Sequence, residues 1–204
     1  MSLFISIEGP DGSGKSTQIE VIKKYLETKG IPFVFTREPG GTPIGERIRE
    51  IILDNTCSEM DSMAEALLYA ASRAQHVKQI IKPALDAGKT VICDRFVDSS
   101  IAYQGYGRKL GESVEIINGF AIDGCLPDIT FLLKLRPDIG KTRIEENRAE
   151  EDRLEHEKIE FHDEVYKGYL ALEKKYSDRI VGIDASGSIE EISAEIIKKL
   201  DELI

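Results

Sequence analysis

The chain has 204 residues, and its 27 lysines and arginines against 37 aspartates and glutamates leave a formal net charge of −10. This length suits one domain over residues 1–204, and no apolar run reaches the roughly 18–20 residues that span a bilayer. The acidity argues against a nucleic-acid or membrane partner, which needs a basic face, but it is compatible with a local basic pocket. The three cysteines lack CxxC spacing and the first residues lack a basic signal region, which predicts a reduced intracellular protein.

Short apolar runs alternate with longer helical patterns, which predicts an α/β fold with a mainly parallel sheet. We expect five strands, each apolar enough to be buried on both faces, at 3–7, 32–36, 90–93, 129–135 and 179–183. We expect helices at 15–29, 43–53, 61–87, 114–124, 138–148, 158–176 and 189–203. Apolar residues at helical spacing support the last of these as a packing helix.

One segment departs from this alternation. Residues 145–160 read EENRAEEDRLEHEKIE and contain almost no large apolar side chains. The segment is therefore expected to be exposed to solvent. It is interpreted either as a solvated helix or as a lid over a site.

The most informative motif follows the first predicted strand and opens the first predicted helix. Residues 9–16 read GPDGSGKS and fit the phosphate-loop pattern GxxxxGK[ST], with a plain glycine-rich turn as the minor alternative. In this pattern backbone N–H groups face phosphate oxygens, the lysine reaches the β- and γ-phosphates, and the serine hydroxyl ligates Mg²⁺. The predicted ATP-binding residues of the loop are Gly9, Pro10, Asp11, Gly12, Ser13, Gly14, Lys15, Ser16 and Thr17.

A second acidic motif supports the first. Residues 90–94 read TVICD, an apolar strand that ends in a carboxylate. This layout is typical of the aspartate that holds Mg²⁺ beside a phosphate loop, so Ser16 and Asp94 are the predicted metal ligands. Capping of the next helix by Asp94 is the structural alternative. The sequence has no NKxD base-recognition motif, which argues against a GTPase switch.

Four arginines mark a second anion site. Arg37 and Arg95 follow predicted strands, at the carboxyl edge where α/β proteins bind ligands, while Arg49 and Arg73 lie on predicted helices. Tyr69 lies four residues before Arg73, on the same helix face. An aromatic plane beside a guanidinium suits a planar base that carries a phosphate. The structural alternative is a partly buried tyrosine beside an exposed arginine.

These segments together resemble thymidylate kinase over nearly the whole chain. The resemblance rests on FISIEGPDGSGKST, TREPGGTPIGERIR, ALLYAASRAQHV, DRFVDSSIAYQGYGR and PDIGKTR followed by NRAEEDRLE. It implies a phosphate-loop nucleoside monophosphate kinase fold with a five-stranded parallel sheet flanked by helices. It also implies transfer of the γ-phosphoryl group of ATP to dTMP with Mg²⁺, usually in a cytoplasmic homodimer.

The resemblance implies roles for matching residues. Asp11 would contact the acceptor sugar or its phosphate and metal surroundings, and Arg143 would pack on adenine. Tyr69, where the family commonly has Phe, would stack on thymine. Arg73 would reach the thymine edge and the acceptor phosphate. Arg95 would bridge the donor and acceptor phosphates.

The resemblance also outlines the acceptor pocket. Tyr103 would occupy the place of a ribose 2′-hydroxyl, and Glu38-Pro39 resembles a turn whose peptide bond is cis in the family. Ser100 and Gln104 would face the base. The full set implied for dTMP is Arg37, Glu38, Pro39, Arg49, Tyr69, Arg73, Arg95, Ser99, Ser100, Tyr103 and Gln104.

Two arginines of segment 145–160 are expected to act in catalysis. Some thymidylate kinases place an arginine directly after the loop aspartate, where this chain has Gly12. In the other layout the lid supplies the positive charge, so Arg148 or Arg153 would reach the transferring phosphoryl group. The predicted catalytic set is Asp11, Lys15, Arg95, Arg148 and Arg153.

The sequence is also compatible with other activities. A phosphate acceptor is already anionic near neutral pH and needs no strong general base, whereas a deoxynucleoside acceptor would need a clear carboxylate base and fewer arginines. Another nucleoside monophosphate is the nearest alternative acceptor. The alternative of a different class is a nucleotide-dependent regulatory switch, which the second arginine-lined site disfavours.

Overall fold

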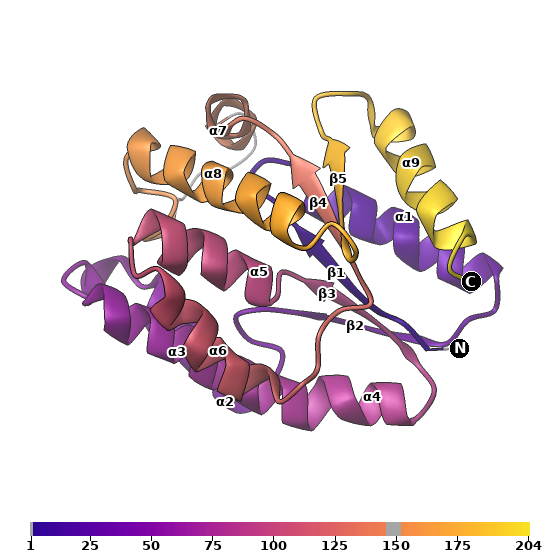
Figure 1. The fold of residues 1–204 in the computed structure, drawn as a ribbon, viewed down its shortest axis with the longest axis horizontal. Helices are drawn as coiled ribbons and strands as arrows, with labels where there is room; N and C mark the ends of the chain where they lie inside the picture. Colours follow the sequence, from indigo (N-terminus) through magenta and orange to yellow (C-terminus); the bar gives the residue numbers. More distant parts are fainter. Residues whose placement is uncertain (1, 146–151) are drawn as a thin grey trace.

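The computed structural model describes residues 2–145 and 152–204, and its centre is a five-stranded parallel sheet (Figure 1). The strands run in the order β2-β3-β1-β4-β5. Their bounds are Phe4–Glu8, Phe33–Arg37, Thr90–Asp94, Ile129–Lys134 and Ile180–Asp184 for β1 to β5. The predicted α/β class, the parallel sheet and its five strands are confirmed, each within a residue or so of the expected bounds.

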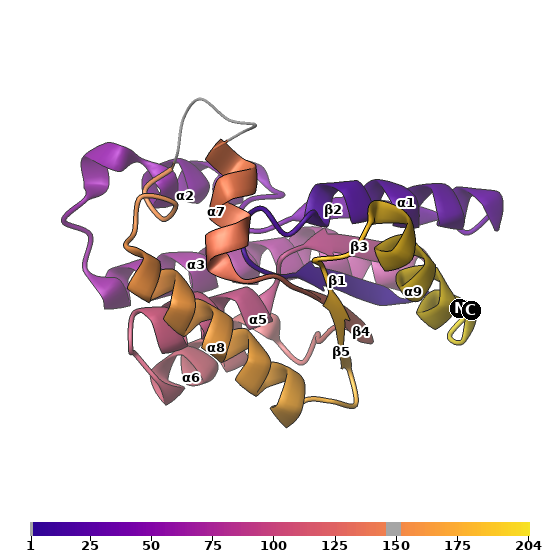
Figure 2. The ribbon, with the colours of Figure 1, turned by 90° about the horizontal axis from the view of Figure 1, so that it is seen from above.

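Helices cover both faces of the sheet (Figures 1 and 2). The helices α1 (Lys15–Thr28) and α9 (Ile189–Asp201) bury an aliphatic layer against the side chains of Ile5 and Ile7. The opposite face, to which Phe4 points, is covered by α3 (Ser62–His76), α4 (Lys82–Asp86), α5 (Val97–Ser100), α6 (Glu112–Ile122) and α8 (Ile159–Lys175). The alternation of side chains along β1 therefore divides the core into two layers.

The remaining helices are α2 (Pro43–Leu53) and α7 (Pro137–Glu145). Thr42 caps α2 by accepting a hydrogen bond from the Gly45 N–H, and Pro43 occupies the first turn, where its missing N–H costs nothing. Within the described residues, no helix is both long and apolar enough to cross a membrane.

The edge strands differ from the prediction. All five strands were expected to be buried on both faces, but β2 and β5 form the edges of the sheet and are only partly covered. Phe35 of β2 is 41% exposed, and the ammonium group of Lys23 lies 3.8 Å from the centre of its ring. An apolar run in sequence does not distinguish a central strand from an edge strand, because the difference lies in which neighbours pair with it.

One helical segment was not predicted. α5 continues into a π-helical stretch, Ile101–Gly107, which the serine- and glycine-rich sequence does not favour. Tertiary packing holds this stretch against α8: a Cβ added at Gly107 would lie 2.6 Å from the ring of Phe161. The glycine therefore permits a close approach that the pattern of apolar residues does not reveal.

The phosphate loop packs directly against α7. Gly12 has φ +76°, and a Cβ there would overlap the carbonyl oxygen of Gly140 in α7. A Cβ at Gly140 would in turn overlap the carbonyl oxygen of Asp11. Two glycines thus bring the backbone of α7 into contact with the backbone of the loop.

Gly140→Ala is expected to destabilise the protein by about 1–3 kcal/mol, because the new methyl group must displace the loop. Gly119→Ala is the matched control, since Gly119 is also helical but has no atom within 4 Å of an added Cβ. The control should be neutral or more stable by about 0.5–1 kcal/mol. Urea unfolding compares the two, and equal midpoints would contradict the close contact.

Candidate active site

A cavity of about 640 Å³ opens at the carboxyl edge of the sheet. In a parallel sheet all strands end at the same edge, which brings together residues far apart in sequence. Most of the predicted site residues line this cavity: Asp11, Gly12, Ser13, Gly14, Lys15, Ser16, Thr17, Arg37, Glu38, Pro39, Arg49, Tyr69, Arg73, Asp94, Arg95, Ser99, Ser100, Tyr103, Gln104 and Arg143. The volume is that of a small-molecule site.

Three predicted residues of the described part of the chain do not line it. Gly9 and Pro10 form the base of the phosphate loop and contribute backbone carbonyl oxygens to it. Arg153 is 8% exposed, donates to the carbonyl oxygen of Ile52 and pairs with Glu65, and it does not line the cavity in this structure. Arg148 lies outside the described residues, and both catalytic assignments stay predictions.

The phosphate loop ends at the first turn of α1. Gly14 precedes this helix in the left-handed region, with φ +89°, a conformation that glycine adopts without strain. No side chain caps the helix, so its first N–H groups remain available to an anion. The loop therefore provides the backbone geometry that the motif predicts for phosphate oxygens.

The Lys15 ammonium group lies inside the curve of the loop. It donates to the carbonyl oxygens of Gly9 and Pro10 at 3.1 and 3.0 Å. Burial, and then repulsion by the Arg95 charge, lower its pKa to about 8. A bound polyphosphate would favour the protonated form, so ligand binding and protonation of Lys15 would reinforce each other.

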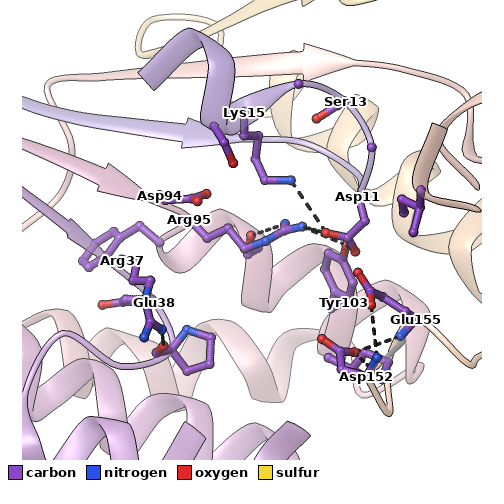
Figure 3. Close-up of a pocket in the computed structure, with 18 of the residues that line it drawn as sticks. Asp11, Ser13, Lys15, Arg37, Glu38, Asp94, Arg95, Tyr103, Asp152 and Glu155 are labelled. Carbon is purple, nitrogen blue, oxygen red and sulfur yellow. Dashed lines mark hydrogen bonds and ion pairs between the residues drawn. The ribbon is translucent and has the colours of Figure 1, made fainter. Parts of the chain in front are cut away.

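Arg95 is held in place by five acceptors. Figure 3 shows Asp11 and Tyr103 among them. Its Nη2 lies 2.5 Å from Asp11 Oδ1 and donates to the hydroxyl of Tyr103 at 3.3 Å. Its Nη1 donates to the carbonyl oxygen of Gly9 and to the hydroxyls of Ser99 and Tyr169, at 3.0 to 3.1 Å. The guanidinium therefore joins the phosphate loop to the end of β3 and to α8.

Asp11 forms the ion pair with Arg95. Burial would raise the pKa of its carboxyl group, but Arg95 and Lys15 hold that pKa well below the usual range. Tyr103 also donates to Asp11 Oδ2 at 3.0 Å. The carboxylate is thus ionised and positioned between the two cations of the site.

The predicted metal ligands suit a magnesium ion held mostly by phosphate oxygens. Ser16 is exposed at the first turn of α1, and Asp94 lies at the end of β3. Asp94 Oδ1 is buried and has no hydrogen-bond partner within the described residues, which an ion or its water would supply. Because those residues contain no group of three or more metal-binding side chains, the remaining ligands would have to come from nucleotide and water.

The opposite end of the cavity contains Tyr69 and Arg73. Arg73 is 1% exposed, so the alternative of an exposed surface arginine is wrong. It donates to Glu38, Ser100 and Asn118 and to the carbonyl oxygen of Phe96. Because arginine has five N–H donors, these four bonds leave one donor for a ligand.

Glu38 connects Arg73 to the following turn. Its carboxylate accepts from Arg73 Nε at 2.7 Å and lies 2.8 Å from Nδ1 of His76, while the Glu38-Pro39 peptide bond is cis, as the resemblance implies. His76 also contacts the Thr36 hydroxyl through Nε2. His76 is therefore a buried structural group.

Arg37 and Arg49 converge on one backbone atom. Both donate to the carbonyl oxygen of Pro39, at 3.0 and 3.1 Å, and Arg37 also pairs with Glu46. Burial and the nearby Arg37 charge lower the pKa of Arg49. Two neighbouring guanidinium groups of this kind favour an anionic ligand.

Glu8 is a buried residue of the site that the sequence analysis missed. It is 0% exposed at the end of β1 and accepts from the Phe96 N–H at 2.6 Å. It also accepts from the hydroxyls of Ser99 and Tyr169, both of which contact Arg95. An acidic residue at the end of an apolar strand was the one available signal. Burial, and then the Asp98 charge, raise the pKa of Glu8 to about 7.

Other residues that line the cavity were not predicted individually. Asp152, Leu154 and Glu155 line the cavity from the charged segment. The predicted residue Arg143 lies beside the phosphate loop, where it donates weakly to the carbonyl oxygens of Gly12 and Ala185. The unpredicted lining residues elsewhere are Gln18, Leu53, Phe96, Ile144, Gly187, Ile189 and Ile192.

Known proteins resemble this chain over almost its full length. The family model described as thymidylate kinase matches residues 7–196. A thymidylate kinase from Lactobacillus helveticus is 52% identical over 202 residues, which cover 98% of this chain and 95% of that protein. One from an Exiguobacterium strain is 48% identical over 196 residues, covering 96% of this chain and 92% of that protein. The crystal structure of thymidylate kinase from Ehrlichia chaffeensis aligns with a TM-score of 0.80 at 37% identity, covering 98% of each chain.

The raised pKa of Glu8 predicts a pH-dependent stability. The folded protein holds the proton of Glu8 more tightly than the unfolded chain does. Protonated Glu8 therefore adds to the free energy of unfolding fully below about pH 4.5, and this addition is lost as the pH rises through about 7. Glu8→Gln has no proton to lose. Its unfolding free energy relative to the parent should therefore rise between about pH 5 and about pH 8 in urea titrations. Parallel curves for the two proteins would contradict the prediction.

Proposed function

The chain belongs to the thymidylate kinase family, and we propose that one cavity holds its two substrates, with ATP on the phosphate loop and dTMP between Tyr69 and the arginines. The enzyme transfers the γ-phosphoryl group of ATP to dTMP, giving dTDP and ADP. The main support for placing both substrates in one cavity is the position of Arg95 between the phosphate loop and the arginine-lined half of that cavity. No feature of the described residues favours a deoxynucleoside acceptor or a regulatory switch.

The donor half is assigned from the loop. The first N–H groups of α1 and the Lys15 ammonium group would bind the β- and γ-phosphates. Arg143 and the nearby residues Gly187 and Ile189 line the cavity beyond the loop, where they would contact adenine.

The acceptor half is assigned from its charges. Arg37, Arg49 and Arg95 would bind the dTMP phosphate, while Tyr69 would stack on the base. Arg73, with one donor left, suits a single bond to the edge of the base better than a two-armed grip on phosphate. Tyr103, 6% exposed and bonded to Asp11, would bring its ring against the sugar.

The chemistry follows from bringing two polyanions together. Unit charges about 4 Å apart interact by roughly 4 kcal/mol at an effective dielectric constant near 20. Lys15 and Arg95 would offset this repulsion and stabilise the charge that develops on the transferring group. No general base is required, because the second pKa of a phosphate monoester is about 6.

A magnesium ion would complete the donor half. The residues that would hold it are Ser16 and Asp94, of which Asp94 has the unpartnered buried oxygen. When bound, Mg²⁺ would withdraw negative charge from the β- and γ-phosphate oxygens.

We also propose that the chain is a single domain whose segment 145–160 closes over ATP. Asp152 and Glu155 already line the cavity, which supports a location over the site. An arginine of this segment would contact the transferring phosphoryl group; for Arg153 this requires release from Glu65. The role of Arg148 rests on the family resemblance alone.

A homodimer is proposed from an unpartnered apolar surface. Phe120 and Ile116 of α6 are 83% and 62% exposed, and Leu67 of α3 is 50% exposed. α6 packs beside α3 and α3 beside α2, so these side chains lie on neighbouring helices (Figure 1). A second copy of the chain is the proposed occupant.

All three cysteines are free thiols, which supports a location in the reducing cytoplasm.

The acceptor assignment predicts the outcome of an ADP-release assay. With ATP and Mg²⁺, dTMP should give a higher kcat/KM than dUMP, UMP, CMP or AMP, because the pocket combines a stacking ring with residues that contact the base and sugar. ADP release that did not depend on any monophosphate would favour a nucleotide hydrolase. A clear preference for one of the other four monophosphates would contradict the acceptor assignment.

The dimer proposal predicts a change in mass. Phe120→Glu should halve the mass measured by sedimentation, because a carboxylate would be buried against the second copy. Leu203→Glu is the matched control, because Leu203 follows the end of α9 and is 40% exposed. This substitution should leave the mass unchanged. A parent protein that is monomeric at all concentrations tested would overturn the proposal.

A further inference from the structure

Glu65 is a buried carboxylate at the centre of a polar cluster, and the proposed reaction gives Glu65 itself no role. It lies on α3, is 0% exposed and accepts hydrogen bonds from three side chains. Arg108 binds both of its oxygens, at 3.3 and 3.1 Å, and Arg153 binds Oε2 at 2.7 Å. Gln104 donates its Nε2 to Oε1 at 2.9 Å.

Two arginines keep this carboxylate ionised. Burial would raise the pKa of Glu65, but the hydrogen bonds from Arg108, Gln104 and Arg153 lower it below the usual range. An ionised carboxylate can only accept hydrogen bonds. The amide group that faces it must therefore present its N–H, since the opposite orientation would place the amide oxygen against a negatively charged oxygen.

This contact fixes the direction of the Gln104 amide. Gln104 is 1% exposed and lines the cavity, and no donor in the described part of the chain binds its Oε1. Its oxygen is also not among the buried, unpartnered side-chain atoms of the described residues, so this oxygen is accessible. The side chain therefore offers an acceptor to a ligand, while Glu65 holds the amide nitrogen through one of its two N–H donors.

We propose that Glu65 is a specificity-determining residue that acts through Gln104: by holding the amide nitrogen, it makes the cavity select a pyrimidine with a hydrogen on N3. This inference rests on the proposed function, in which Gln104 faces the base of the acceptor. Thymine and uracil carry N3–H, which can donate to the Gln104 oxygen. Cytosine has a lone pair at N3, which would face that oxygen with no hydrogen between them.

The test compares ratios of kcat/KM for three acceptors, dTMP, dUMP and dCMP, in the full-length protein. In Glu65→Gln, position 65 can donate as well as accept, so the Gln104 amide can turn and offer its N–H to cytosine. The ratio of dTMP to dCMP should fall about 10-fold or more. The ratio of dTMP to dUMP should not change, because both bases carry N3–H. A purely structural role for Glu65 would lower all three values together.

Asp98→Asn is the matched control. Asp98 is 1% exposed and pairs with Arg179, so this variant also replaces a buried, ion-paired carboxylate by an amide. Asp98 does not line the cavity, and its loss should leave both ratios unchanged even if the protein is less stable. A fall in the dTMP to dCMP ratio in this control would show that the loss of any buried, ion-paired carboxylate relaxes specificity. That result would overturn the inference.

Gln104→Leu provides a second variant if Glu65→Gln does not fold. Leucine can neither donate nor accept, so the dTMP to dCMP ratio should fall here as well. An unchanged ratio in this variant, or in folded Glu65→Gln, would overturn the inference. A different result would contradict the proposed function: the unsubstituted enzyme would then show no preference for dTMP over dCMP.

Discussion

Asp11 stabilises the close approach of two cations, Lys15 and Arg95, and the active site depends on this arrangement. The Asp11 carboxylate lies 2.5 Å from Arg95 Nη2 and 3.7 Å from Lys15 Nζ, while the carbonyl oxygen of Gly9 accepts from both cations. Burial, and then repulsion by the Arg95 charge, lower the pKa of Lys15. The same contacts tie the phosphate loop to β3, and through Tyr169 to α8, so the fold and the charge of the site are set together.

The net charge of −10 fits this local arrangement. Lysine and arginine side chains gather at one edge of the sheet, while carboxylates outnumber them over the chain as a whole. A cavity of about 640 Å³ with this lining favours small phosphate ligands, and the acidic remainder disfavours a long polyanion. Phosphoryl transfer requires this combination, because two anionic substrates must meet in line while water and larger anions stay out.

Local patterns predicted the parts of the structure whose chemistry lies within a short stretch of sequence. The phosphate loop, the strand ending in Asp94 and the Tyr69–Arg73 spacing placed their side chains correctly in one cavity. The buried partners were missed because they depend on contacts between distant segments, such as Arg153 with Glu65 or Arg95 with Tyr169. The π-helical stretch 101–107 was missed for the same reason, since packing against α8 outweighs its weak helical propensity.

The most direct test of this account is the affinity of a molecule that joins adenosine and thymidine through their 5′ positions by a chain of five phosphates. If one cavity holds both substrates with their phosphates facing each other, the linked molecule should bind about 10²–10⁴-fold more tightly than ATP or dTMP alone. Calorimetry should find one linked molecule per chain, displacing both substrates. An affinity no higher than that of the better single substrate, or displacement of only one of them, would contradict the account.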